Sequence, residues 1–220
     1  MRTRTAAGTA LADTDFVSAS GIDTLFPGST SDTVKILVRG DSRYHPPLQF
    51  SVLLDTPSTV APAVSRLAAV GTIRSSKGRP AISVAPASLA EGDAGTRPFA
   101  FVVSLRDSAS GDEVASRVDM PFSWTSAAGT ARDGVDFLAL AGSGKIPAGS
   151  ASATVVMDSA IGNLLHQADR SFSVTVSPSG TDLRPGNAVA TGTILDDDPT
   201  PLVSVADVSV ARDTVDGSRK

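Results

Sequence analysis

An internal repeat organises this chain. Residues 129–137 read GTARDGVDF, and residues 8–16 read GTALADTDF, 121 positions earlier. The same offset relates residues 71–73 to residues 192–194, which both read GTI. Because a repeat of this length is one structural unit of an array, the sequence predicts similar domains joined in series.

The offset also sets the expected domain boundaries. One complete unit covers residues 80–199, and a unit truncated at its N-terminus covers residues 1–76. Residues 200–220 are expected to supply the first strand of a third, truncated unit, at residues 203–205. We therefore expect a segment of a longer array. Because the first unit lacks the counterparts of the early strands, we expect it to be marginally stable in isolation.

Apolar and polar residues alternate in short runs that are separated by Gly, Pro, Ser and Asp. This period of two is typical of half-buried β-strands rather than helices. In the complete unit it predicts about seven strands in roughly 120 residues, which indicates an all-β fold made of two packed sheets. In the first unit it predicts strands at residues 34–38, 50–54 and 67–73.

Composition excludes several classes of function. The net charge is −4, with 19 basic and 23 acidic residues scattered along the chain, so no basic stripe favours nucleic acid. No apolar run is long enough to span a bilayer, and no signal peptide is recognisable, so we expect any export signal to lie outside this chain. The absence of cysteine excludes disulfides and thiol catalysis.

Several landmarks then resemble one family. They are Ser83-Val84, Glu91-Gly92-Asp93, Asp136-Phe137 after residues 129–131, Phe172, and residues 192–199, which read GTILDDDP. In order and spacing they are similar to the Calx-beta domain. This resemblance implies immunoglobulin-like β-sandwich repeats, and it implies Ca²⁺ binding in acidic loops at one end of the sandwich.

The resemblance also implies candidate metal ligands. Glu91, Asp196, Asp197 and Asp198 match acids of the family, and Asp93 is a fifth candidate carboxylate. The chain departs from calcium-binding members at Ala128, at the loop before Phe172, which lacks an acid-rich run, and at Arg170. We therefore expect at most one weak Ca²⁺ site, with a dissociation constant of roughly 10⁻⁴ to 10⁻³ M. The first unit carries Ser75-Ser76-Lys77 in place of the acidic triplet.

A second interpretation of the acidic residues remains open. The run from Asp196 to Pro199 also suits a solvated linker between sandwiches, and residues 91–93 also suit a turn. Arg39-Gly40-Asp41 is the tripeptide that integrins recognise, although a match of three residues arises easily by chance. His45 and His166 are expected to occupy matching loop positions, one in each unit. No acid, base and nucleophile come together in the sequence, so we do not expect an enzyme.

These observations predict a non-catalytic spacer or adhesion scaffold, located outside the cell or at its surface, in a larger membrane-associated protein. Its expected partners are neighbouring Calx-beta repeats of the same array and cell-surface or matrix proteins. The alternative is a metal-free accessory structural or ligand-binding module of a larger multidomain secreted enzyme. An exposed row of aromatic side chains on one sheet would favour that alternative.

Overall fold

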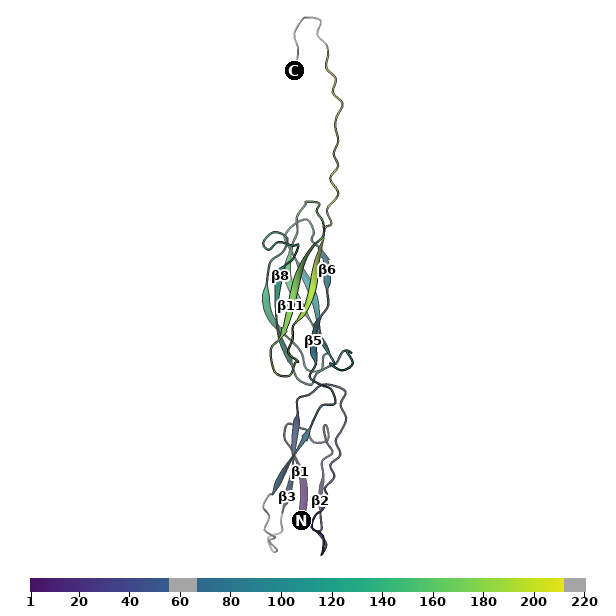
Figure 1. The fold of residues 1–220 in the computed structure, drawn as a ribbon, viewed down its shortest axis with the longest axis vertical. Coiled ribbons are helices and arrows are strands. Elements are labelled where there is room, and N and C mark those ends of the chain that lie inside the picture. Colours follow the sequence, from purple (N-terminus) through teal and green to yellow (C-terminus); the bar gives the residue numbers. More distant parts are fainter. Residues whose placement is uncertain (56–66, 212–220) are drawn as a thin grey trace.

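The structure is a computed structural model that describes residues 1–55 and 67–211. Throughout this part the chain is all-β, which confirms the expected fold class. The strands form two units that lie end to end, unit one (residues 1–76) and unit two (residues 80–199), and a tail extends beyond unit two (Figure 1). No helix in the described residues is long and apolar enough to cross a membrane.

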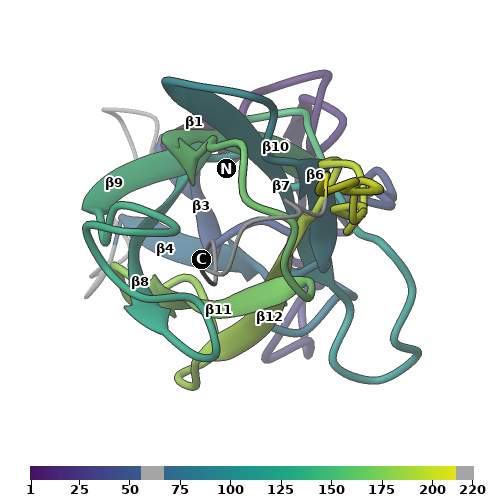
Figure 2. The same cartoon turned by 90° about the horizontal axis from the view of Figure 1, so that it is seen from above.

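Unit two is a sandwich of two sheets. Its strands are β5 (Ala81–Val84), β6 (Ala87–Ala90), β7 (Thr96–Arg106), β8 (Met120–Ala128), β9 (Ala141–Ile146), β10 (Ser152–Ile161), β11 (Arg170–Pro178) and β12 (Ala188–Leu195). One sheet has the order β10-β7-β5, and the other has the order β6-β12-β11-β8-β9. Viewed along the long axis, β7 and β10 lie on one side of the unit, and β8, β11 and β12 lie on the other (Figure 2). All pairs are antiparallel except β12 with β6, which is parallel.

Unit two has eight strands rather than about seven because its first strand is divided. The chain pairs with β7 as β5, passes Ala85 and Pro86, and then pairs with β12 in the opposite sheet as β6. Proline has no amide hydrogen to donate to a ladder, so it suits the point at which the strand changes sheets. This switch brings β6 beside the end of β12.

The core of unit two lies between the sheets, as the alternating pattern predicts. Along β7, the inward-facing residues Phe99, Phe101, Val103 and Leu105 are at most 1% exposed. Phe172 of β11 packs edge-on against Phe99, with ring centroids 5.1 Å apart, and stacks on Phe137 at 4.8 Å. Burial of these aromatic side chains provides much of the stability of the unit.

Unit one forms a single sheet with a small core. Its strands, in the order β2-β1-β3-β4, are β1 (Arg2–Ala7), β2 (Ser20–Ile22), β3 (Leu48–Asp55) and β4 (Ala68–Ile73). The buried cluster comprises Ala10, Phe16, Phe50 and Ile73. The strand expected at residues 34–38 is absent, and only a bridge between Phe16 and Val38 forms there. In unit two the matching strand, β10, pairs with β7, and the described part of unit one has no counterpart of β7 to pair with.

The tail beyond unit two also lacks the expected strand. Residues 199–211 form no strand, and Val203 and Val205 are 99% and 95% exposed. The tail leaves unit two as an extended segment (Figure 1), so no neighbouring strand satisfies its backbone groups. That residues 200–220 begin a third repeat stays a prediction, and residues 212–220 lie outside the described part.

Unit two also contains one residue more than unit one before the loop at residues 162–169. The amide of Arg39 donates to the carbonyl of Asp15, and the amide of Ile161 donates to the carbonyl of Asp136. Asp15 and Asp136 are 121 positions apart, whereas Arg39 and Ile161 are 122 positions apart. From this point the equivalent residues of the two units are therefore offset by 122. The extra residue of unit two lies in β10, whose register shifts at residues 158–160. Gly40 therefore matches Gly162, Tyr44 matches His166, and His45 matches Gln167. The expected equivalence of His45 and His166 was wrong by one position.

Candidate metal site

Two parallel strands end side by side at the end of unit two from which the tail leaves (Figure 1). β6 and β12 stay paired up to Ala90 and Leu195, and the amide of Glu91 donates to the Leu195 carbonyl over 3.0 Å. Parallel strands end at the same edge of a sheet. The residues that follow them, Glu91 and Asp196, are therefore close together.

Three carboxylates meet at this edge, those of Glu91, Asp196 and Asp198. One oxygen of each lies within 4.8 Å of the other two. Ca²⁺ holds its oxygen ligands at roughly 2.3–2.6 Å, so two ligands of one ion lie up to about 5 Å apart. Glu91 is 1% exposed and Asp198 is 8% exposed, so solvent has little access to the cluster. This geometry suits one hard cation.

The cluster carries more negative charge than its neighbours balance. Oδ1 of Asp196 and Oδ2 of Asp198 are buried and have no hydrogen-bond partner within the described residues. Burial raises the pKa of Glu91 above its ordinary value of 4.5; a hydrogen bond from Gln167 opposes this increase, and the nearby aspartates reinforce it. Burial and the charges of Asp196 and Asp197 raise the pKa of Asp198. A bound cation would relieve both effects.

The loop at residues 162–169 adds two amide side chains and a histidine to the site. Nδ2 of Asn163 donates to Oε2 of Glu91 over 2.8 Å, and Nε2 of Gln167 donates to Oε1 over 3.1 Å. Nδ1 of His166 lies 2.7 Å from Oδ2 of Asp196. Sequence reasoning missed these residues because it searched this loop for acids. Their amide groups could have been found, since amide oxygens also bind Ca²⁺.

The structure brings together three of the five predicted ligands. Asp197 points elsewhere, because its Oδ1 accepts a hydrogen bond of 3.0 Å from the amide of Gly92. Asp93 is exposed and lies outside the three-carboxylate cluster. Asp197 thus closes the turn that carries Glu91, while Asp198 faces the cluster.

Unit one has a different arrangement at the matching end. Ser75, Ser76 and Lys77 replace the acidic triplet, and Nζ of Lys77 pairs with Oδ2 of Asp107 in unit two at 3.0 Å. Unit two covers this end of unit one. The matching ends of the two units therefore differ both in charge and in exposure to solvent.

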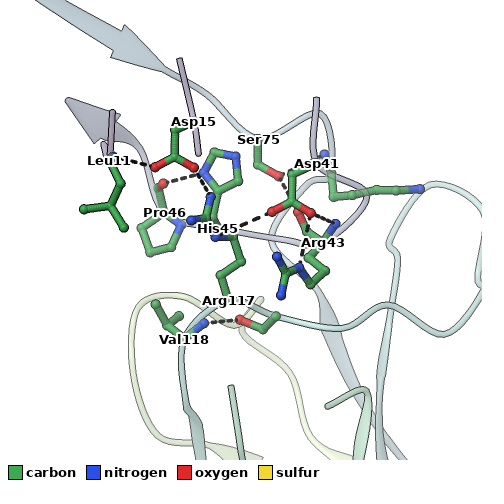
Figure 3. Close-up of polar contacts among 11 residues, drawn as sticks. Leu11, Asp15, Asp41, Arg43, His45, Pro46, Ser75, Arg117 and Val118 are labelled. Carbon is green, nitrogen blue, oxygen red and sulfur yellow. Dashed lines mark hydrogen bonds and ion pairs between the residues drawn. The ribbon is translucent and has the colours of Figure 1, made fainter. Parts of the chain in front are cut away.

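An arginine of unit two enters this end of unit one (Figure 3). Nη1 of Arg117 donates to Oδ1 of Asp15 at 2.5 Å, and its Nε lies 3.5 Å from Oδ2 of Asp41. Asp15 is 4% exposed. Burial alone would raise the pKa of Asp15, but hydrogen bonds from Arg117 and from the amide of Leu11 outweigh it and lower the pKa. At this junction a guanidinium group therefore neutralises the carboxylates.

The tripeptide Arg39-Gly40-Asp41 belongs to the same junction. The carboxylate of Asp41 pairs with Nε of Arg43 at 3.2 Å as well as with Arg117, and its side chain is 19% exposed. Integrin recognition would need this carboxylate to be free. Recognition of the tripeptide was not predicted from the sequence and is untested, and the geometry gives it no support.

Comparisons with known proteins give one family match and several similar structures. The sequence profile of the Calx-beta domain family matches residues 1–75 and 100–198. A comparison with curated protein sequences finds no match. Similar solved structures include the crystal structure of the apo-form Calx CBD1 domain, which is 21% identical with a TM-score of 0.42 and covers 54% of this chain and 98% of its own.

Two further structures show a similar relationship. The crystal structure of calcium binding domain CBD12 of CALX1.1 is 17% identical with a TM-score of 0.35, and the match covers 82% of this chain and 66% of that one. The crystal structure of the Calx CBD2 domain is 13% identical with a TM-score of 0.40, and the match covers 55% of this chain and 92% of that one. The family profile spans most of the described residues, and this chain belongs to the Calx-beta domain family.

Proposed function

We propose that unit two binds one Ca²⁺ ion through Glu91, Asp196 and Asp198, and that the chain is a non-catalytic spacer in an array of Calx-beta units. The observation that carries this proposal is the buried cluster of three carboxylates, in which two oxygens have no partner within the described residues. Asn163 and Gln167 would supply further oxygens if their amide groups rotated. The site is weak because neutral side chains replace the additional acids of a multi-ion cluster.

A bound ion would stiffen the end of unit two. It would hold the end of β12, and therefore the segment that follows it, against the turn after β6. Without the ion, the raised pKa values of Glu91 and Asp198 indicate that their charged forms are disfavoured in the folded state. Calcium would thus control how firmly the chain beyond Asp198 is held to the sandwich.

The setting of this function is an extracellular or cell-surface protein, in which neighbouring Calx-beta units and cell-surface or matrix proteins are the partners. An array of end-to-end sandwiches would serve there as a spacer or an adhesion scaffold. The alternative is a metal-free accessory structural or ligand-binding module of a larger multidomain secreted enzyme, and an exposed row of aromatic side chains would favour it. Trp124 packs against the core and Tyr44 is 4% exposed, and the chain has no other Trp or Tyr.

Thermal unfolding with and without Ca²⁺ tests the metal site. Trp124 lies in β8 and is the only tryptophan, so its fluorescence reports on unit two alone. With a dissociation constant of about 10⁻³ M, about 10 mM Ca²⁺ stabilises the unit by roughly 1.4 kcal/mol. For a domain of this size, that corresponds to a rise of roughly 5 °C in Tm.

Two variants of the acidic triplet make this test specific. Asp198→Asn removes a cluster carboxylate, so it should abolish the rise in Tm. Asp197→Asn keeps an oxygen to accept the Gly92 amide and lies outside the cluster, so it should retain the rise. Identical melting curves with calcium and with chelator in the unsubstituted chain would refute the metal site.

A further inference from the structure

The junction inside this chain shows how two units of this kind meet. Tyr44, in the loop at residues 40–47 of unit one, packs into the core of unit two and is 4% exposed. The amide of Tyr44 donates to the carbonyl of Ala115 over 2.9 Å, and the amide of Arg117 donates to the carbonyl of Tyr44 over 2.8 Å. The Tyr44 hydroxyl donates to Oδ1 of Asp182 over 3.3 Å. Backbone and side chain of one loop therefore join the two units.

The exchange between the units is reciprocal. Tyr44 extends from unit one into unit two, and Arg117 extends from unit two to Asp15 in unit one. Both the loop at residues 40–47 and the segment at residues 114–118 are thus contact elements. The first lies at one end of a unit, and the second lies at the opposite end of a unit.

Unit two carries its own copy of the first contact element. Its loop at residues 162–169 matches residues 40–47 one for one, since Gly162 matches Gly40 in the backbone hydrogen-bond pattern described above. This loop borders the candidate metal site. It lies at the end of unit two that faces away from unit one (Figure 1).

This second copy is uncovered. Leu164 and Leu165, which match Ser42 and Arg43, are each 72% exposed. The side chain of His166 is 41% exposed, whereas its match Tyr44 is 4% exposed. These two leucines place adjacent apolar side chains on the outside of the loop, where a docked partner would remove them from water. Unit two therefore presents, uncovered, the element that is buried in the first junction.

We infer that the loop at residues 162–166 docks a further β-sandwich unit of the same kind, which presents the segment that matches residues 114–118. We identify the partner as such a unit because, at the junction inside this chain, the matching loop at residues 40–47 contacts the segment at residues 114–118 of the next unit. Leu164 and Leu165 make this second junction more apolar than the first. The arginine that matches Arg117 would approach Asp136, which matches Asp15, is likewise buried and already pairs with Arg132 of its own unit at 3.5 Å.

This docking does not depend on the proposed calcium site. The first junction forms from a tyrosine, an arginine and backbone hydrogen bonds, at an end of unit one that has no acidic triplet. A test in the presence of chelator therefore distinguishes the two proposals. Loss of the calcium response would leave the docking intact, and loss of the docking would leave the calcium response intact.

The test is an extended chain in which everything from Pro201 onward is replaced by a second copy of residues 80–199. This replacement preserves the spacing between units, because Ile73 precedes Pro80 by the same number of residues as Ile194 precedes Pro201. The chain has no cysteine, so two spin labels can be placed without interference. Labels at Val156 and at its counterpart in the added copy report the distance across the new junction.

Labels at Val70 and Val156, both on exposed strand positions, give the reference for the first junction. With chelator present, the extended chain should give a distance distribution about as narrow as this reference. The double change Leu164→Asp and Leu165→Asp should widen the distribution across the new junction at least twofold. Val189→Asp, at a 64% exposed position near the start of β12, should leave it unchanged.

Two outcomes would overturn the inference. One is a distribution in the unsubstituted extended chain that is several times wider than the reference. The other is an equal width in the leucine double variant and in Val189→Asp. Trp fluorescence on unfolding checks that each variant keeps the stability of unit two, so a wide distribution in a folded variant reports the junction itself.

Discussion

Arg117 of unit two and Asp15 of unit one form an ion pair across the junction, with Nη1 and Oδ1 2.5 Å apart and the Asp15 side chain 4% exposed. The matching aspartate of unit two, Asp136, receives its cation from within its own unit, since Nε of Arg132 lies 3.5 Å from its Oδ2. Unit one has Leu11 where unit two has Arg132. Unit one therefore depends on its neighbour for this positive charge.

Removal of Arg117 should consequently destabilise unit one. In Arg117→Ala the Asp15 carboxylate stays buried without its partner, and loss of one member of a buried pair costs about 3 kcal/mol. Hydrogen exchange of the amides in β1 and β3 measures this loss. Arg106→Ala breaks the surface pair with Glu113, whose side chains are 42% and 51% exposed, and should change exchange little. Equal protection in the two variants would contradict the role of Arg117.

The titration of Tyr44 provides a second test of the junction. Burial, followed by the charge of Asp182 and the hydrogen bond to it, raises the pKa of Tyr44 to about 12. Tyr44 is the only tyrosine, so ultraviolet absorbance of the phenolate follows it directly. Because the folded pKa is raised, the junction loses stability as the pH rises from about 10 towards 12. A midpoint near 10, the ordinary value, would show that Tyr44 is not inserted in unit two.

Substitution of two equivalent glycines, Gly162 and Gly40, tests where the candidate site lies. A Cβ at Gly162 would lie 2.2 Å from the carbonyl oxygen of Gly92 and 2.7 Å from that of Glu91, whereas a Cβ at Gly40 would meet nothing within 4 Å. Gly162→Ala should therefore displace the turn that holds Glu91 and reduce the calcium-induced rise in Tm. Gly40→Ala should leave that rise unchanged. A full calcium response in Gly162→Ala would contradict the placement of the site.

The stability of unit two without metal should fall as the pH increases. The pKa values of Glu91 and Asp198 are raised in the folded state. The contribution of these two groups to the stability of the unit is therefore complete below their unfolded pKa values of about 4, and it is lost as the pH rises through their folded pKa values. Trp124 fluorescence in chelator should show a falling Tm above about pH 4.5, and calcium should suppress the decrease. Asp198→Asn should flatten the profile. A Tm in chelator that rises over this interval would oppose the assignment.

Period-two alternation was sufficient to predict the sandwich, because strands such as β7 and β11 bury one face each. The acids after β6 and β12 could be predicted from the family resemblance. The sequence could not show which side chain of the triplet faces inward, because this depends on the hydrogen bond from Gly92 to Asp197. It also could not show the extra residue in β10, because a bulge changes register without a distinctive residue type.

The contacts at the junction could not be predicted for a different reason. Arg117 and Asp15 are 102 positions apart and lie in loops of different units. Nothing in the local pattern around either residue indicates the other. The prediction of a strand at residues 34–38 was wrong for a similar reason. A strand forms only where a neighbouring strand can pair with it, and the alternation of apolar and polar residues does not show whether such a neighbour is present.

A calcium titration of the full chain by calorimetry is the most direct test of the account. We predict one saturable site with a dissociation constant of roughly 10⁻⁴ to 10⁻³ M, lost in Asp198→Asn and retained in Asp197→Asn. Uptake of calcium should release protons in mildly acidic solution, because Glu91 and Asp198 have raised pKa values and must be charged to bind the ion. The absence of saturable heat, or an equal titration in the two variants, would contradict a site formed by Glu91, Asp196 and Asp198.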